Sequence, residues 1–161
     1  MRMASERTEG VLVARDRTRQ LHVGKVPVGG GAPVSVQSMC TTKTDDPSST
    51  LSQIAHLAEE GCEIIRVAVP NAAVLDGFGE ICRLSPLPVV ADIHFDHRLA
   101  IEAARRGAAA LRVNPGNIGS FKRVDAVIDA AGEANIPIRI GVNAGRSEEH
   151  TSELQSQPTI S

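Results

Sequence analysis

Three arginines of this 161-residue sequence occupy the same kind of position, near the end of a short segment rich in β-branched residues. They are Arg66, Arg112 and Arg139. A guanidinium group offers a planar fork of donors that matches phosphate oxygens. A buried group of three like charges is unfavourable without a counter-charge, and we expect Asp92 to neutralise only one of them. The pattern predicts a phosphate-binding site, with pairing of the arginines to Asp or Glu inside the fold as the alternative.

Further polar residues lie two positions from these charged ones, a spacing that puts side chains on one face of a strand. The candidate substrate-binding residues are Arg66, Asp92, His94, Arg112, Asn114, Arg139 and Asn143. Possible further contacts are Gln37, Lys43 and Asn117.

Three of these candidates have more than one interpretation. His94 is a general acid, a ligand contact or a hydrogen-bonded histidine, and its position beside Asp92 favours ligand contact. The segment Asn114-Pro-Gly-Asn117 fits a tight turn, or a helix start that attracts an anion. Lys43 follows the first strand, where it either reaches the site or is a solvated loop lysine.

The elements that position these residues alternate along the chain. Strands are predicted at 34–39, 64–69, 88–93, 110–113 and 136–142, and helices at 47–60, 71–84, 96–106 and 120–134. Asp46 is the expected cap of the first helix, and Gly61 is expected to end it. The alternation predicts right-handed βαβ units and a parallel sheet.

Two architectures contain such units, a doubly wound open sheet and a closed barrel. An open sheet concentrates its ligand groups at one switch point, whereas a barrel gathers them from every strand onto one mouth. Polar groups end every predicted strand, which favours the barrel. The predicted fold class is α/β, an incomplete (β/α)8 TIM-type barrel with about five of eight strands, preceded by a short hairpin within residues 10–28.

Composition excludes several functions. The net charge is −2, which gives no general attraction to nucleic acid or anionic lipid. No apolar run is long enough to span a membrane, and we expect a cytoplasmic protein. Cys40, Cys62 and Cys82 form no C-x-x-C pair, so they are expected to be reduced thiols, with no metal site in this chain.

The strand-end motifs together have a specific resemblance. They are Val36-Gln-Ser-Met39, Arg66-Val-Ala-Val-Pro70, Val90-Ala-Asp-Ile-His-Phe95, Arg112-Val-Asn-Pro-Gly-Asn-Ile-Gly119 and Ile138-Arg-Ile-Gly-Val-Asn143. In this order, from about Val11 to Gly145, the chain closely resembles the 4-hydroxy-3-methylbut-2-en-1-yl diphosphate synthase family of the non-mevalonate isoprenoid pathway.

The resemblance implies an oxidoreductase of isoprenoid (terpenoid) biosynthesis. Members of the family open the ring of 2-C-methyl-D-erythritol 2,4-cyclodiphosphate reductively, with electrons from flavodoxin or ferredoxin that pass through a [4Fe-4S] cluster on a second domain, and they act as homodimers. By motif match, Arg66, Arg112 and Arg139 resemble diphosphate contacts. His94, Asn114 and Asn143 resemble further substrate contacts, and the role of Asp92 is left open.

The chain departs from the family towards its end. The segment Arg146-Ser-Glu-Glu-His-Thr-Ser-Glu-Leu-Gln-Ser156 matches a translated sequencing adapter. We expect a disordered tail at 1–9, a partial barrel that binds substrate at 10–145, and a non-native adapter at 146–161. The C-terminal [4Fe-4S] domain is expected to be absent from this chain, which would then bind no cofactor and be inactive and poorly soluble alone.

Two other functions remain open. One is a TIM-barrel enzyme of the pterin-binding kind, which also places Asn and Arg at strand ends. The other is a non-catalytic diphosphate-binding module.

Overall fold

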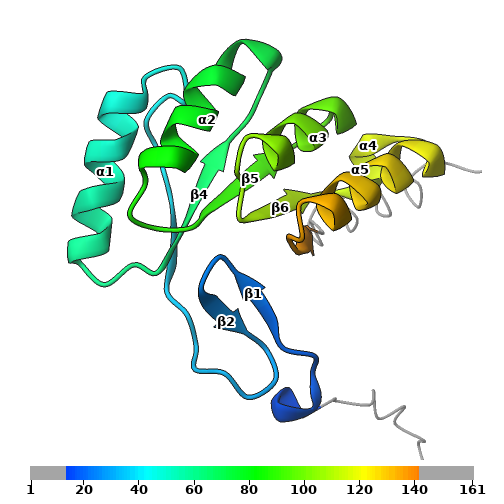
Figure 1. The fold of residues 1–161 in the computed structure, drawn as a ribbon, viewed down its shortest axis with the longest axis horizontal. Coiled ribbons are helices and arrows are strands. Elements are labelled where there is room, and N and C mark those ends of the chain that lie inside the picture. Colours follow the sequence, from blue (N-terminus) through cyan, green and yellow to red (C-terminus); the bar gives the residue numbers. More distant parts are fainter. Residues whose placement is uncertain (1–13, 142–161) are drawn as a thin grey trace, which may run out of the picture.

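The computed structural model describes residues 14–141 and contains a five-stranded parallel sheet with helices along the chain between its strands (Figure 1). The sheet order is β3 (Gln37–Met39), β4 (Ile64–Ala68), β5 (Val89–Ile93), β6 (Ala110–Val113) and β7 (Ile138–Ile140). Because consecutive strands are neighbours and all pairs are parallel, this is the β/α arrangement predicted from the sequence. Strands β3 and β7 are the two edges, so the barrel is not closed.

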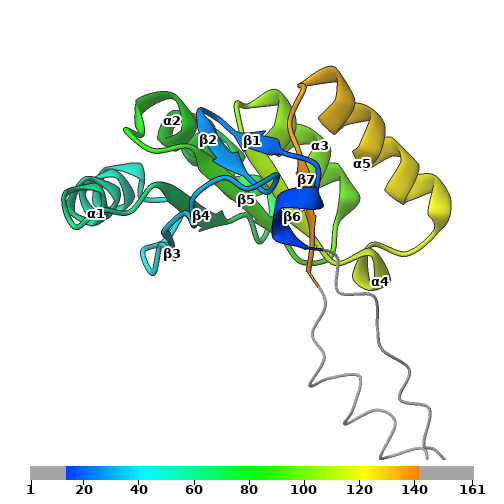
Figure 2. The same cartoon turned by 90° about the horizontal axis from the view of Figure 1, so that it is seen from below.

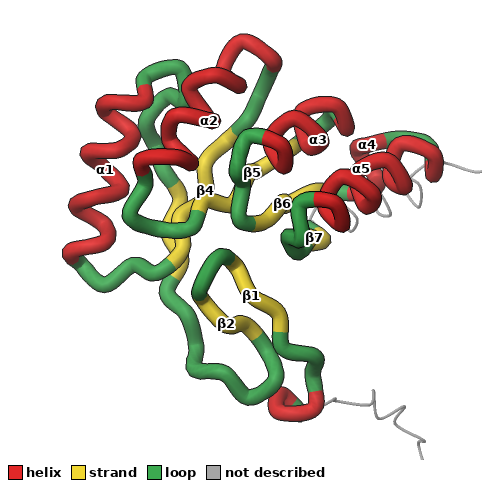
Figure 3. The backbone as a smooth tube through the Cα atoms, viewed as in Figure 1, coloured by secondary structure: helices red, strands yellow, loops and turns green. Residues whose placement is uncertain are grey.

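The helices are shown with the strands in Figure 3. They are α1 (Pro47–Glu59), the 3-10 turn η2 (Ala72–Val74), α2 (Leu75–Leu84), α3 (His97–Arg105), α4 (Pro115–Ile118) and α5 (Phe121–Glu133). The predicted cap of α1 is confirmed, because the Asp46 side chain accepts a hydrogen bond from the Ser49 amide. One prediction needs correction: the segment 71–84 begins with a 3-10 turn, and the α-helix starts only at Leu75.

The predicted hairpin is confirmed, as β1 (Leu21–Val23) paired antiparallel with β2 (Val26–Val28) after the short 3-10 turn η1 (Arg15–Arg17). Gly24 turns the chain between the two strands with φ 58°, a conformation that favours glycine. A Cβ atom there would lie 2.8 Å from the Cβ of Pro88, so the turn packs closely against the start of β5.

Strand alternation divides the buried apolar residues into two groups. On the helix-facing side, residues such as Ile65, Ala91 and Leu111 pack against α1, α2, α3 and α5 in one large core. On the other side, a small cluster joins the hairpin to the sheet and comprises Val23, Val26, Ile64, Val90 and Ala110. Figure 2 shows the hairpin lying across this second side. We call it the inner face, because it corresponds to the interior of a barrel.

The inner face changes character along the strands. At the amino ends it carries the apolar Ile64, Val90 and Ala110, which the hairpin covers. Two residues further along, the same face carries Arg66, Asp92 and Arg112. The apolar layer and the hairpin therefore close the inner face on the amino-terminal side of the charged residues. Within residues 14–141, no helix has the length and apolar character needed to cross a membrane.

Candidate anion-binding site

Asp92 is the centre of the site. It is fully buried on β5, and its register partner on β6 is Arg112. Adjacent parallel strands place such partners on the same face, so the two side chains meet, with Arg112 Nη1 3.1 Å from Asp92 Oδ1. A buried carboxylate needs this kind of partner, because leaving water is costly for an unpaired charge.

Arg66 contacts the other carboxylate oxygen, with its Nε 3.2 Å from Asp92 Oδ2. Within residues 14–141 neither atom has a hydrogen-bond partner, so the distance is short but the N–H direction is unfavourable. We therefore treat the contact as an attraction between charges. The sequence predicts that Asp92 neutralises one arginine. The single negative charge of Asp92 balances one positive charge, but the carboxylate contacts two arginines, Arg66 and Arg112.

Arg139 reaches the site from the far edge of the sheet. Its Nη1 donates a hydrogen bond to Oε1 of Gln37, which lies on the opposite edge strand. The sheet is therefore curved enough for side chains of β3 and β7 to meet. Among the ion pairs of the described residues none includes Arg139. Burial, and then the charge of Arg66, lower the pKa of Arg139 from its usual value.

His94 joins the same cluster. Its Nε2 lies 3.5 Å from Asp92 Oδ2, and its side chain is about half exposed. The side chains of Arg66 and Arg112 are 29% and 20% exposed, so both remain within reach of a dissolved ligand. The alternation that placed these side chains on one face is thus confirmed.

Three candidates are not brought into the cluster by any contact of the described residues. The side chain of Asn114 caps the short helix α4 by accepting a hydrogen bond from the Gly116 amide, at 3.1 Å. Asn117 is exposed, and its amide donates to the Asn114 carbonyl. Lys43 is exposed on the loop after β3. The fourth, Asn143, lies outside the described residues.

Two contacts of the cluster were not predicted. Arg66 Nη2 lies 3.1 Å from the sulfur of Met39 on β3. The guanidinium of Arg112 lies against Gly141, where a Cβ atom would be 2.6 Å from its Nε and Nη2. Met39 could have been found from its position two residues after Gln37. The contact of Gly141 with Arg112 has no signal in the sequence, because it depends on which way Arg112 turns.

The cluster has an excess of positive charge. Two guanidinium groups contact one carboxylate, and the third, that of Arg139, is close enough to Arg66 to interact with its charge, which leaves two positive charges unbalanced, not counting His94. Such an arrangement on an exposed face attracts an anion with several oxygens. Its chemistry is binding and charge stabilisation at the carboxyl ends of parallel strands, where β/α barrels place their ligands.

The described cysteines do not fit a metal or iron–sulfur ligand set. Within residues 14–141 no three His, Cys, Asp or Glu side chains converge as ligands. Burial raises the pKa of Cys82 to about 12. Burial, followed by the charge of Cys62, raises the pKa of Cys40 to about 11. Both thiols are protonated near neutral pH.

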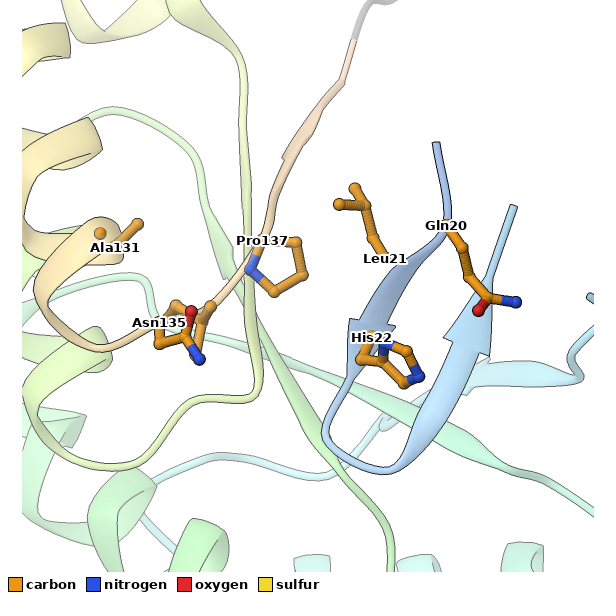
Figure 4. Close-up of a pocket in the computed structure, with 8 residues that line it drawn as sticks. Gln20, Leu21, His22, Ala131, Asn135 and Pro137 are labelled. Carbon is orange, nitrogen blue, oxygen red and sulfur yellow. The ribbon is translucent and has the colours of Figure 1, made fainter. Parts of the chain in front are cut away.

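A hollow of about 300 Å³ lies at the other end of the sheet (Figure 4). Leu21 and His22 of the hairpin form one side of it, and Asn135 and Pro137, which precede β7, form the other. It contains no arginine, and it lies at the amino ends of the strands. It is therefore separate from the anion-binding cluster.

The fold and the cluster define a β/α-barrel-type domain with a group of arginines at the carboxyl ends of its strands. The chain belongs to the GcpE TIM-barrel domain family, whose family model matches residues 18–160. That match includes most of the segment after Gly145, whose interpretation as adapter stays a prediction.

Curated relatives share this region. The chain is 50% identical over 147 residues to the 4-hydroxy-3-methylbut-2-en-1-yl diphosphate synthase (flavodoxin) of Idiomarina loihiensis, covering 91% of this chain and 40% of the relative. It is 54% identical over 143 residues to the protein of that name from Geobacter sulfurreducens, covering 89% and 40%. The chain thus spans about 40% of the length of these relatives. The match favours the synthase family over a pterin-binding barrel.

Proposed function

We propose that this chain is the diphosphate-binding part of a 4-hydroxy-3-methylbut-2-en-1-yl diphosphate synthase, an oxidoreductase of isoprenoid biosynthesis. The observation that carries the proposal is a cluster of three arginines, of which Arg66 and Arg112 contact one buried carboxylate and Arg139 interacts with the charge of Arg66. The family membership and the names of the relatives support it. A cytoplasmic location and a homodimer belong to the same proposal.

The proposed substrate is 2-C-methyl-D-erythritol 2,4-cyclodiphosphate. In a cyclic diphosphate each phosphorus keeps one ionised oxygen, so the ligand's charge balances the excess charge of the cluster. Asp92 holds Arg66 and Arg112 on the inner face. Arg139 has only the neutral Gln37 as its partner among the described residues, and it is therefore the arginine most available to the ligand.

The same residues would stabilise charge during ring opening. When a phosphate oxygen separates from the carbon of the ring, negative charge develops on that oxygen, and fixed guanidinium groups next to it lower the energy of this state. His94, about half exposed beside the carboxylate, is proposed to contact the ligand. Because the cysteines described above do not fit a cluster, we assign the [4Fe-4S] cluster and the electron transfer from flavodoxin or ferredoxin to regions outside this chain.

The test begins at the gene. The locus would be amplified from genomic DNA across the codon for Gly145, and the complete reading frame would be expressed. We expect the purified protein to convert the cyclic diphosphate in the presence of a reduced flavodoxin, and to bind inorganic pyrophosphate. A protein that binds pyrophosphate without turnover would support the non-catalytic module instead, and one that does neither would contradict the proposal.

A further inference from the structure

We propose that Gly141 is a positioning residue for Arg112, so that its missing side chain determines where this guanidinium is presented to the anion. This inference rests on the proposed function, because it concerns the same site. It goes beyond it by assigning a role to a residue that carries no functional group.

The contact is closer than any side chain would permit. A Cβ atom on Gly141 would lie 2.6 Å from Nε and from Nη2 of Arg112, and 2.7 Å from Cζ. Carbon–nitrogen contacts between atoms that are not bonded do not reach such distances. The Arg112 guanidinium therefore occupies the space that a side chain at position 141 would fill.

The backbone does not require glycine at this position. Gly141 is not among the described glycines with positive φ, so an alanine could adopt its conformation. Its amide donates a 2.8 Å hydrogen bond to the carbonyl of Val113, which alanine would also make. The closest obstacle to a side chain is Arg112, since the three atoms nearest to the built Cβ position all belong to its guanidinium group.

The consequence of a side chain would be displacement of Arg112. The clashing atoms are the far end of a flexible side chain, so they can move without a shift of the backbone. Movement would disturb the 3.1 Å contact between Arg112 Nη1 and the buried Asp92 Oδ1. Gly141→Ala should therefore weaken ligand binding and also lower stability, because Asp92 loses part of its pairing.

Two described features show why the position of Arg112 matters. Asp92 is shared between Arg112 and Arg66, so a shift of one guanidinium alters the charge balance of the other. Arg112 is also the register partner of Arg139 across β6 and β7. A displaced Arg112 would thus change the spacing of the cations that must contact one diphosphate together.

The experiment is a double-mutant cycle in the complete protein, with inorganic pyrophosphate as the probe and calorimetry as the measurement. Gly141→Ala is expected to weaken binding about tenfold in the wild-type background and to have no further effect in Arg112→Ala. Gly132→Ala is the matched control, because no atom lies within 4 Å of the Cβ it would add on α5. Melting temperatures would be compared for all variants.

The outcomes separate this inference from the proposed function. If the wild-type protein does not bind pyrophosphate, the proposed function fails, and the inference about ligand presentation fails with it. If the wild type and Gly141→Ala bind pyrophosphate equally well, only the role of Gly141 is overturned. The role of Gly141 is also overturned if Gly141→Ala weakens binding equally in the wild-type and the Arg112→Ala backgrounds. A crystal structure of Gly141→Ala provides the independent check, with Arg112 expected to be displaced from Asp92 and an unmoved guanidinium contradicting the inference.

Discussion

Asp92 and Arg112 are register partners on β5 and β6, and their side chains meet on the inner face at 3.1 Å. The same carboxylate lies 3.2 Å from Arg66 on its other side. One buried anion thus holds two cations that belong to its two neighbouring strands. This sharing fixes the guanidinium groups while leaving the cluster with excess positive charge, which is the property that an anion site needs.

The first prediction concerns the carboxylate. Asp92→Asn keeps the shape of the side chain but removes the negative charge that offsets the repulsion between Arg66 and Arg112. We expect a loss of about 2–4 kcal/mol in the free energy of unfolding, since a buried ion pair is broken but its partners stay partly exposed. Pyrophosphate should restore more stability to this variant than to the wild type, because the ligand replaces the missing negative charge.

Thermal unfolding with and without pyrophosphate measures both effects. Asp129→Asn, a change of an exposed residue on α5, is the control and should behave as the wild type. Equal stabilisation of Asp92→Asn and wild type by pyrophosphate would show that the carboxylate does not compensate the arginines.

The second prediction concerns the arginine without a carboxylate partner among the described residues. Arg139→Ala should weaken pyrophosphate binding by about tenfold to a hundredfold, the usual value of charge-assisted hydrogen bonds. The affinity of Arg139→Ala for pyrophosphate should also depend less on salt concentration than that of the wild type, because one charge contact is lost. Titration calorimetry at several salt concentrations measures this. Arg105→Ala, at an exposed position on α3, should leave the affinity unchanged; similar losses in both variants would mean that the effect is only one of net charge.

The third prediction follows from the buried thiol of Cys82, whose pKa is raised to about 12. Only the thiolate reacts with iodoacetamide. In the folded protein the alkylation rate of Cys82 should therefore increase about tenfold per pH unit well above pH 9, instead of levelling off near the usual thiol pKa. Mass spectrometry of peptides after timed alkylation measures the profile, with urea-unfolded protein as the control. A plateau near pH 9 in the folded protein would contradict the raised pKa.

The raised pKa of Cys82 also makes the stability of the folded protein depend on pH in a defined direction. A thiol whose pKa is higher in the folded state stabilises the protein fully below the unfolded value. This contribution is lost as pH rises from about 9 through about 12, because the unfolded chain releases its proton first. Cys82→Ala should reduce this alkaline loss.

The fourth prediction concerns the two sheet edges in the chain expressed as printed. Val36 before β3 is 54% exposed and Ile140 on β7 is 61% exposed, next to strand edges that no other described strand pairs with. Such edges promote association between chains. Val36→Lys together with Ile140→Lys should increase the soluble fraction after centrifugation, whereas Leu84→Lys, at the exposed end of a helix, should not. If the double variant and Leu84→Lys increase the soluble fraction alike, added charge rather than the loss of edge pairing controls solubility.

Much of the fold could be predicted because it is encoded locally. The predicted strand at 110–113 is found with the same bounds, and the cap at Asp46 is found in place. The ends of other elements moved by a few residues, since tertiary packing decides where hydrogen bonding stops. Of the two structures that the segment Asn114-Pro-Gly-Asn117 allowed, a tight turn or a helix start, the structure has the short helix α4, with Asn114 as its cap and Pro115 as its first residue.

The sequence by itself determined which residues share the inner face, because alternation along a strand is a local property of the backbone. It thereby placed Arg66, Asp92 and Arg112 on one surface. Only the tertiary structure decided that Asp92 serves two arginines, that Arg139 meets Gln37 across 102 residues of chain, and that Gly141 makes room for Arg112. These contacts depend on strand register, sheet curvature and side-chain rotation, which arise from packing between distant segments and leave no periodic signal in the sequence.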